Sequence, residues 1–227
     1  MHLVLIAVIV LAIVFGPGIW VQRVMRQYSE PENRYKETGA EIARQLLAAL
    51  NLSQVTVERT ESGDHYDPVE KVVRLSPGHF DRRSLAAVTV AAHEVGHALQ
   101  DHQGYAPLKV RTRLVGLTRG VERFGAAILM ASPFIGMISR APGLGALVFL
   151  GGLASLGTAT LVHLVTLPTE FDASFARAMP MLEQGEILRP EDRRHARRLL
   201  TAAALTYVSA SLMSLLNIAR WWAIVRR

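Results

Sequence analysis

One pentad constrains the fold of this chain more than any other feature of its sequence. It reads His93-Glu94-Val95-Gly96-His97, the pattern HExxH. Two histidines four residues apart lie on one face of an α-helix, one turn apart, which is the separation that two ligands need to bind one tetrahedral zinc ion. The Glu94 carboxylate can reach the open coordination position and take a proton from a water there. The pentad therefore predicts a helix that carries a hydrolytic metal site.

The helix that carries the pentad is expected from about Ser84 to His102. Its apolar run, from Leu85 to Ala92, is bounded on both sides by charged and polar residues. A membrane span needs about 20 apolar residues, so this run is too short to cross a bilayer. We therefore expect the pentad in water or at a membrane interface.

The segment before the pentad predicts a helix and two strands. Thr38 and Glu41 form a capping-box pattern, and the apolar stripe that follows stops at Asn51, which indicates a short amphipathic helix. Residues 55–58 and 72–75 are β-branched runs separated by a polar stretch, and we expect them to form a small antiparallel hairpin.

Four long uncharged stretches predict membrane-spanning helices. They are Leu3–Val21, Phe124–Ser139, Ala141–Thr169 and Leu199–Ala219. At about 1.5 Å per residue these helices approach the roughly 30 Å of a bilayer core, except the second, which reaches only about 24 Å. The expected fold class is a mainly α membrane protein with about four transmembrane helices and a small α+β zincin-like catalytic domain.

This pattern divides the chain into five parts. We expect a transmembrane anchor at 1–22, a zincin-like catalytic domain with the HExxH helix at 23–122, a transmembrane hairpin at 123–169, a third-ligand helix and cytoplasmic connection at 170–198, and a C-terminal membrane helix at 199–227. The first stretch has no Lys or Arg before it and no small-x-small cleavage site after it, which favours an anchor over a cleaved signal peptide.

The basic charge of the chain indicates topology and not nucleic-acid binding. The formal net charge is +6, but 21 of the 25 Lys and Arg residues lie in two segments, 22–123 and 170–198. Such clustering beside apolar stretches is what the positive-inside rule produces, so both segments are expected on the cytoplasmic side. Four spans with these two segments inside would place the C-terminus outside. Three arginines after residue 219 argue against that location, and the last helix could instead be tilted or only partly inserted.

The third zinc ligand must be a histidine or a carboxylate, because the chain has no cysteine. His163 lies in the third uncharged stretch, and His102 is expected to lie off the ligand face of the pentad helix. Glu170 is the better candidate, because it follows the third stretch where that stretch ends beside the catalytic domain. Asp172 is a second candidate there.

Both acids also have a structural interpretation. Thr169 and Asp172 form a capping-box pattern that predicts the start of a new helix, where an acid interacts favourably with the helix dipole. The cap is the favoured interpretation for Asp172. An oxyanion donor is harder to assign, and His65, Tyr66 and Tyr207 are the candidates.

Four sequence stretches closely resemble the YugP family of bacterial zinc-dependent membrane metallopeptidases. They are residues 64–68, 73–76, 91–100 and 167–174. The chain is more distantly similar to HtpX-type membrane gluzincins, whose third ligand is a glutamate that opens an ExxxD motif on a later helix. This resemblance implies Glu170 as the third ligand. The aspartate position holds Ser174, so the carboxylate that would orient a ligand histidine is missing there, and Asp172 or Asp67 is a candidate to replace it.

The sequence thus predicts a membrane-embedded zinc endopeptidase. His93, His97 and Glu170 would bind Zn²⁺, and Glu94 would be the catalytic base. The expected partners are a peptide or membrane-protein substrate and the lipid bilayer, with no nucleic acid, and the expected location is a bacterial cell (inner) membrane with the site facing the cytoplasm. The alternative is a non-catalytic membrane scaffold or adaptor that retains a zinc site. An intact Glu94 speaks against it, because binding alone does not need that carboxylate.

Overall fold

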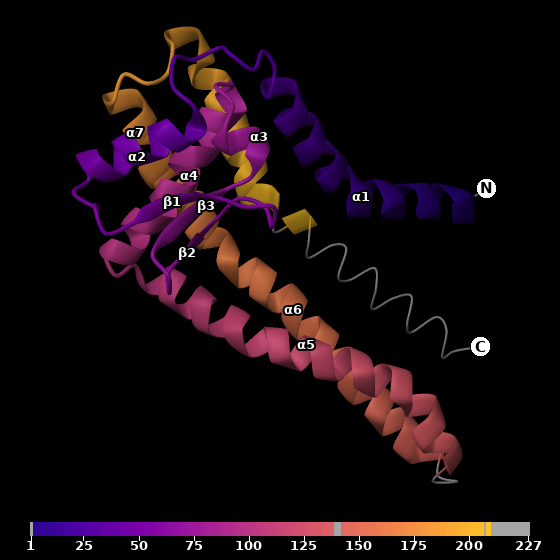
Figure 1. Cartoon of the computed structure of the whole chain (residues 1–227). Helices are drawn as coiled ribbons and strands as arrows, with labels where there is room; N and C mark the ends of the chain where they lie inside the picture. The colour runs from indigo at the N-terminus through magenta and orange to yellow at the C-terminus, as the bar shows by residue number, and fades with distance from the viewer. Residues whose placement is uncertain (1, 139–141, 207, 210–227) are drawn as a thin grey trace. The chain divides into compact units, whose positions relative to one another are not determined.

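The chain folds into two compact units. A computed structural model describes residues 2–138, 142–206 and 208–209 (Figure 1). One unit comprises Met1–Gly18, Val110–Thr166 and Tyr207–Arg227, and the second comprises Ile19–Lys109 and Leu167–Thr206. Three long helices contribute residues to both units: α1 (His2–Tyr28), α5 (Ala106–Ile138) and α6 (Pro142–Phe171).

The prediction of about four transmembrane helices is wrong. The structure is mostly helical with one small sheet, and in the part of the chain that it describes no helix has both the length and the apolar character needed to cross a membrane. The uncharged stretch 124–139 illustrates why runs in the sequence are a poor guide. Residues 124–138 of this stretch form the second half of α5, whose first half carries basic residues such as Lys109, Arg111 and Arg113. Residues 210–219 of the fourth predicted stretch lie outside the described residues.

Helix α4 (Leu85–His102) forms the centre of the second unit, and it confirms the helix predicted around the pentad. The Ser84 side chain caps its first turn by accepting a hydrogen bond from the Ala87 amide. Almost every residue of α4 is buried, because α2 (Gly39–Ala49), α3 (Pro77–Phe80) and two strands of the sheet contact it (Figure 1). The capping box predicted at the start of α2 is also confirmed.

A three-stranded sheet lies beside α4. Its strands are β1 (Thr56–Arg59), β2 (His65–Asp67) and β3 (Val72–Leu75), in the order β1-β3-β2. Because β1 and β3 are parallel, the predicted antiparallel hairpin is wrong. The polar stretch between them contains β2, which pairs with β3 in antiparallel orientation. The Asp67 carboxylate stabilises the turn between β2 and β3 by accepting hydrogen bonds from the Val69 and Glu70 amides.

Helix α6 continues past Glu170 without a break. It passes into a π-helical segment, η1 (Asp172–Ala178), then into α7 (Met179–Gln184). No helix starts at Thr169, so the capping-box prediction for Thr169 and Asp172 is wrong. A 3-10 turn, η2 (Pro190–Asp192), then leads into helical residues 193–206.

A buried carboxylate ties the connection after α1 to η2. Asp192, which is 1% exposed, accepts two hydrogen bonds of 2.6 Å from the Arg34 guanidinium and one of 2.6 Å from the Tyr35 hydroxyl. Burial alone would raise the pKa of Asp192, but the hydrogen bonds from Arg34 and Tyr35 outweigh it and lower that pKa. This cluster joins the two chain segments of the second unit.

Candidate metal centre

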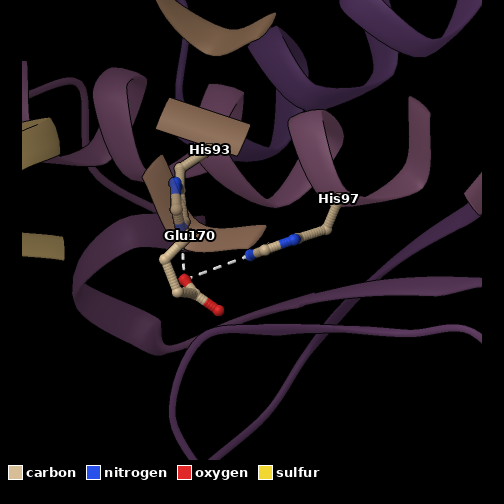
Figure 2. Close-up of side chains that lie close together, drawn as sticks. All are labelled: His93, His97 and Glu170. Atoms are coloured by element: carbon tan, nitrogen blue, oxygen red, sulfur yellow. Dashed lines mark ion pairs between the residues drawn. The ribbon is translucent and has the colours of Figure 1, made fainter. Parts of the chain in front are cut away.

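The structure brings His93, His97 and Glu170 together inside the second unit. The two histidines extend from α4, and Glu170 lies one residue before the end of α6 (Figure 2). The Glu170 Oε2 atom lies 3.3 Å from His93 Nε2 and 3.4 Å from His97 Nε2. The three potential ligand atoms are within 4.8 Å of one another, and all three residues are buried.

These separations suit a tetrahedral zinc ion. Two ligand atoms that each lie about 2.0–2.1 Å from such an ion are about 3.3–3.4 Å apart. Both measured distances from Glu170 Oε2 to the imidazole nitrogens fall there. Imidazole nitrogen and carboxylate oxygen are also common zinc ligands, so this group of side chains fits the metal in both spacing and chemistry.

Gln100 determines which nitrogen of His97 carries a proton. Its side-chain amide nitrogen donates to the Thr169 carbonyl oxygen at 2.9 Å, so its own carbonyl oxygen faces His97 Nδ1, also at 2.9 Å. Because that oxygen can only accept, His97 must donate from Nδ1. The Nε2 atom of a neutral His97 then presents its lone pair toward Glu170.

Ser174 plays the same part for His93. Its hydroxyl donates to the Leu200 carbonyl oxygen at 3.2 Å and therefore accepts from His93 Nδ1 at 3.1 Å. In the neutral tautomers that these hydrogen bonds select, the Nε2 atoms of both histidines face Glu170 as acceptors. Two lone pairs and a carboxylate oxygen repel one another at these distances unless a cation lies among them. The hydrogen bonds around the site therefore support the same assignment as the distances.

Close packing between α4 and η1 sets the position of these groups. A Cβ atom built on Gly96 would lie 2.7 Å from the Ala173 carbonyl oxygen, well inside normal contact. Only glycine allows the two backbones to approach this closely. Ala173 precedes Ser174 directly, so the contact also determines how near the Ser174 hydroxyl lies to His93.

The remaining predicted site residues occupy varied positions. Glu94 lies on α4 and is buried. The Asp67 carboxylate binds the β2–β3 turn and Arg74, and it makes no hydrogen bond to either histidine of the site. The side chain of His163 and all of Tyr207 lie outside the described residues. The described metal-binding group does not include His102.

The proposed oxyanion donors on β2 are engaged elsewhere. The Tyr66 hydroxyl donates to Asp101 at 2.7 Å, and burial together with this bond raises the pKa of Tyr66. His65 Nδ1 lies 2.9 Å from the Gly63 carbonyl oxygen. Gln100 was not among the residues predicted to contact His97. The spacing could have indicated it, because a residue three positions after a helical histidine lies on the same face.

A buried pair of histidines one helical turn apart, completed by a glutamate from a later helix, is typical of zinc metallopeptidases. The chain belongs to such a family, described as "Putative neutral zinc metallopeptidase", which it matches over residues 3–226. It is also similar to "Putative membrane protease YugP" of Bacillus subtilis (strain 168), with 35% identity over 212 residues, 91% of this chain and 90% of that protein. No solved structure matches the chain. The resemblance noted in the sequence and the zinc cofactor that it implied are thus confirmed.

Proposed function

We propose that this protein is a zinc-dependent endopeptidase in which His93, His97 and Glu170 hold the metal. The observation that carries the proposal is that two imidazole nitrogens lie 3.3 and 3.4 Å from one carboxylate oxygen, that of Glu170. Glu94, on the same helix, is the proposed catalytic base. A scaffold that only binds zinc would not need this carboxylate, which favours the enzyme over the adaptor. We also propose that the catalytic domain is discontinuous and includes the segment after Glu170.

The bound metal and the side chains of the site would supply different parts of the proposed reaction. When bound, zinc supplies a Lewis acid that increases the acidity of water and polarises a carbonyl group. Glu94 takes a proton from the attacking water and delivers it to the leaving amine as the peptide bond breaks. His93 and His97 would bind the metal through Nε2, because Ser174 and Gln100 accept their Nδ1 protons. Burial of the site excludes bulk water from these proton transfers.

Glu170→Ala tests the metal site. The variant should lose zinc and peptide hydrolysis together, and its zinc affinity should fall by more than the 10–100-fold that is typical when only an orienting residue is removed. The measurement is zinc content of the purified full chain, with affinity from competition against a chelator. Glu61→Ala is a control, since its side chain is 82% exposed. Stoichiometric zinc of wild-type affinity in Glu170→Ala would contradict the assignment.

We further propose that the protein acts at a bacterial membrane, with its site on the cytoplasmic side. The name of the Bacillus relative supports this location. Basic residues concentrated in 22–123 and 170–198 are attracted to the anionic cytoplasmic leaflet, which supports the orientation.

Val69→Cys tests the proposed location. Val69 is 82% exposed and the chain has no native cysteine, so the variant carries one accessible thiol. We expect it in the membrane fraction, unlabelled by an impermeant thiol reagent in intact cells and labelled after permeabilisation. Labelling in intact cells would place the site outside.

A further inference from the structure

The carboxylate of Asp172 lies beside the candidate metal site and is linked to His97 through the side chain of Gln100. Asp172, the first residue of η1, accepts a 2.7 Å hydrogen bond from the Gln100 side-chain nitrogen through its Oδ2 atom. The same oxygen accepts a 2.7 Å hydrogen bond from Arg177 Nε. Since the other end of the Gln100 amide faces His97, the contacts form one path from Arg177 through Asp172 and Gln100 to His97.

The carboxylate fixes the orientation of the Gln100 amide. Gln100 is fully buried, and its two amide protons go to the Thr169 carbonyl oxygen and to Asp172. A hydrogen bond to an ionised acceptor is roughly twice as strong as one to a neutral acceptor. If the amide turned over, its oxygen would face both of these oxygens, and its NH₂ group would face the proton on His97. Asp172 thereby disfavours the orientation that would give His97 the wrong protonated nitrogen.

Arg177 holds this carboxylate from its other side. Its side chain is only 12% exposed, it also donates to the Gln103 side-chain oxygen, and its guanidinium carbon lies 5.5 Å from the centre of the Tyr105 ring. These contacts restrict the guanidinium, and its charge compensates that of the partly buried Asp172. The carboxylate is thus held between two donors on different elements of the second unit.

The two histidines are oriented by separate sets of contacts. Ser174 orients His93 and donates to the Leu200 carbonyl oxygen, and among the described residues it makes no hydrogen bond to Gln100 or Asp172. Gln100 and Asp172 act on His97 alone. Removing a second member of the same set should therefore add little to the loss of zinc affinity, whereas removing one member of each set should weaken zinc binding further than either single change.

We propose that Asp172 is a positioning residue for the metal ligand His97 and acts through the Gln100 side-chain amide. This role rests on the proposed function, because it presumes that His97 binds zinc. It also replaces the helix-cap interpretation of Asp172, since α6 runs into η1 without a break at this residue.

The test is a set of zinc affinities measured on the full chain by competition with a chelator. Asp172→Ala and Gln100→Leu should each weaken zinc binding by about 10–100-fold. The variant that combines Asp172→Ala with Gln100→Leu should bind zinc no more weakly than the weaker-binding of the two single variants. Gln100→Leu combined with Ser174→Ala should instead bind zinc more weakly than either single variant, because both histidines then lose their orienting partners. Visible absorption bands of the cobalt-loaded protein should shift in Asp172→Ala, because the His97 ligand changes orientation.

A polarity exchange tests the direction of the hydrogen bond. Gln100→Glu should weaken zinc binding, because two carboxylates then face each other across the present 2.7 Å contact. Adding Asp172→Asn should recover part of the affinity, since an asparagine amide can donate to the new carboxylate. No recovery in the double variant would contradict the proposed contact.

Asp192→Asn separates positioning from general loss of stability. It lies outside the site in the same unit, so it should lower the unfolding temperature and leave zinc affinity unchanged. If Asp172→Ala behaved in the same way, with unaltered zinc affinity and cobalt spectrum, Asp172 would be structural and the positioning role would be wrong. A wild-type chain that bound no zinc would overturn the proposed function and this role together.

Discussion

Glu94→Gln should abolish peptide hydrolysis and leave the zinc site filled. The amide has nearly the shape of the carboxylate but cannot accept a proton, so the proposed general base is lost while His93, His97 and Glu170 are unchanged. General acid–base catalysis contributes typically 10²–10⁴-fold to a rate, so we expect a decrease of at least about 10²-fold. The measurement is turnover of a peptide substrate together with zinc content of the same preparation.

The control for Glu94→Gln is the same chemical change at an exposed glutamate. Glu61→Gln should retain both activity and zinc, since the Glu61 side chain is largely in solvent. Near-normal turnover in Glu94→Gln would contradict the proposed role of Glu94. Loss of zinc from this variant would instead indicate that Glu94 supports the metal ligands, which our assignment does not predict.

The elements best predicted from the sequence are those defined by local signals. Ser84 and the capping box of Thr38 and Glu41 mark helix starts that the structure confirms. The strands of residues 56–59 and 72–75 also lie close to their predicted positions. Their parallel pairing could not be read from composition, because it depends on the third strand at residues 65–67.

The prediction of membrane spans was wrong because it rested on uncharged runs in the sequence alone. Uncharged runs do not follow the bounds of the helices that contain them, since α5 combines an apolar half with a basic half. In the described chain no helix meets the requirements for crossing a bilayer.

The three candidate ligands could be predicted from the sequence, but their supporting contacts could not. Motif spacing and resemblance indicate His93, His97 and Glu170, and the structure places these residues together. The contact of Ser174 with His93 could not be predicted from the sequence, because the ExxxD pattern indicates only that this position lacks a carboxylate. Its hydroxyl reaches His93 because η1 is π-helical and closely packed on α4. That geometry depends on contacts between residues about 80 positions apart in the chain, which no local pattern encodes.

Gly96→Ala should damage the site although it changes neither a ligand nor the base. The added methyl group would lie 2.7 Å from the Ala173 carbonyl oxygen, so α4 and η1 must move apart. Overpacking of this kind costs about 1–3 kcal/mol, which exceeds the roughly 1 kcal/mol by which alanine favours a helix over glycine. The displacement also moves Ser174 and Glu170 relative to the histidines. A misplacement of about 1 Å can lower a rate by about 10²-fold, so we expect up to this loss in activity.

Gly116→Ala provides the matched comparison, because it adds the same methyl group to another helix where no atom lies within 4 Å. It should keep wild-type activity and zinc affinity, with stability unchanged or raised by up to about 1 kcal/mol. Thermal unfolding, zinc competition and peptide turnover of both variants measure the difference. Because alanine is the better helix former at both positions, a loss confined to Gly96→Ala must come from the contact with Ala173. Wild-type zinc affinity and turnover in Gly96→Ala would show that the approach of α4 to η1 does not set the geometry of the metal centre.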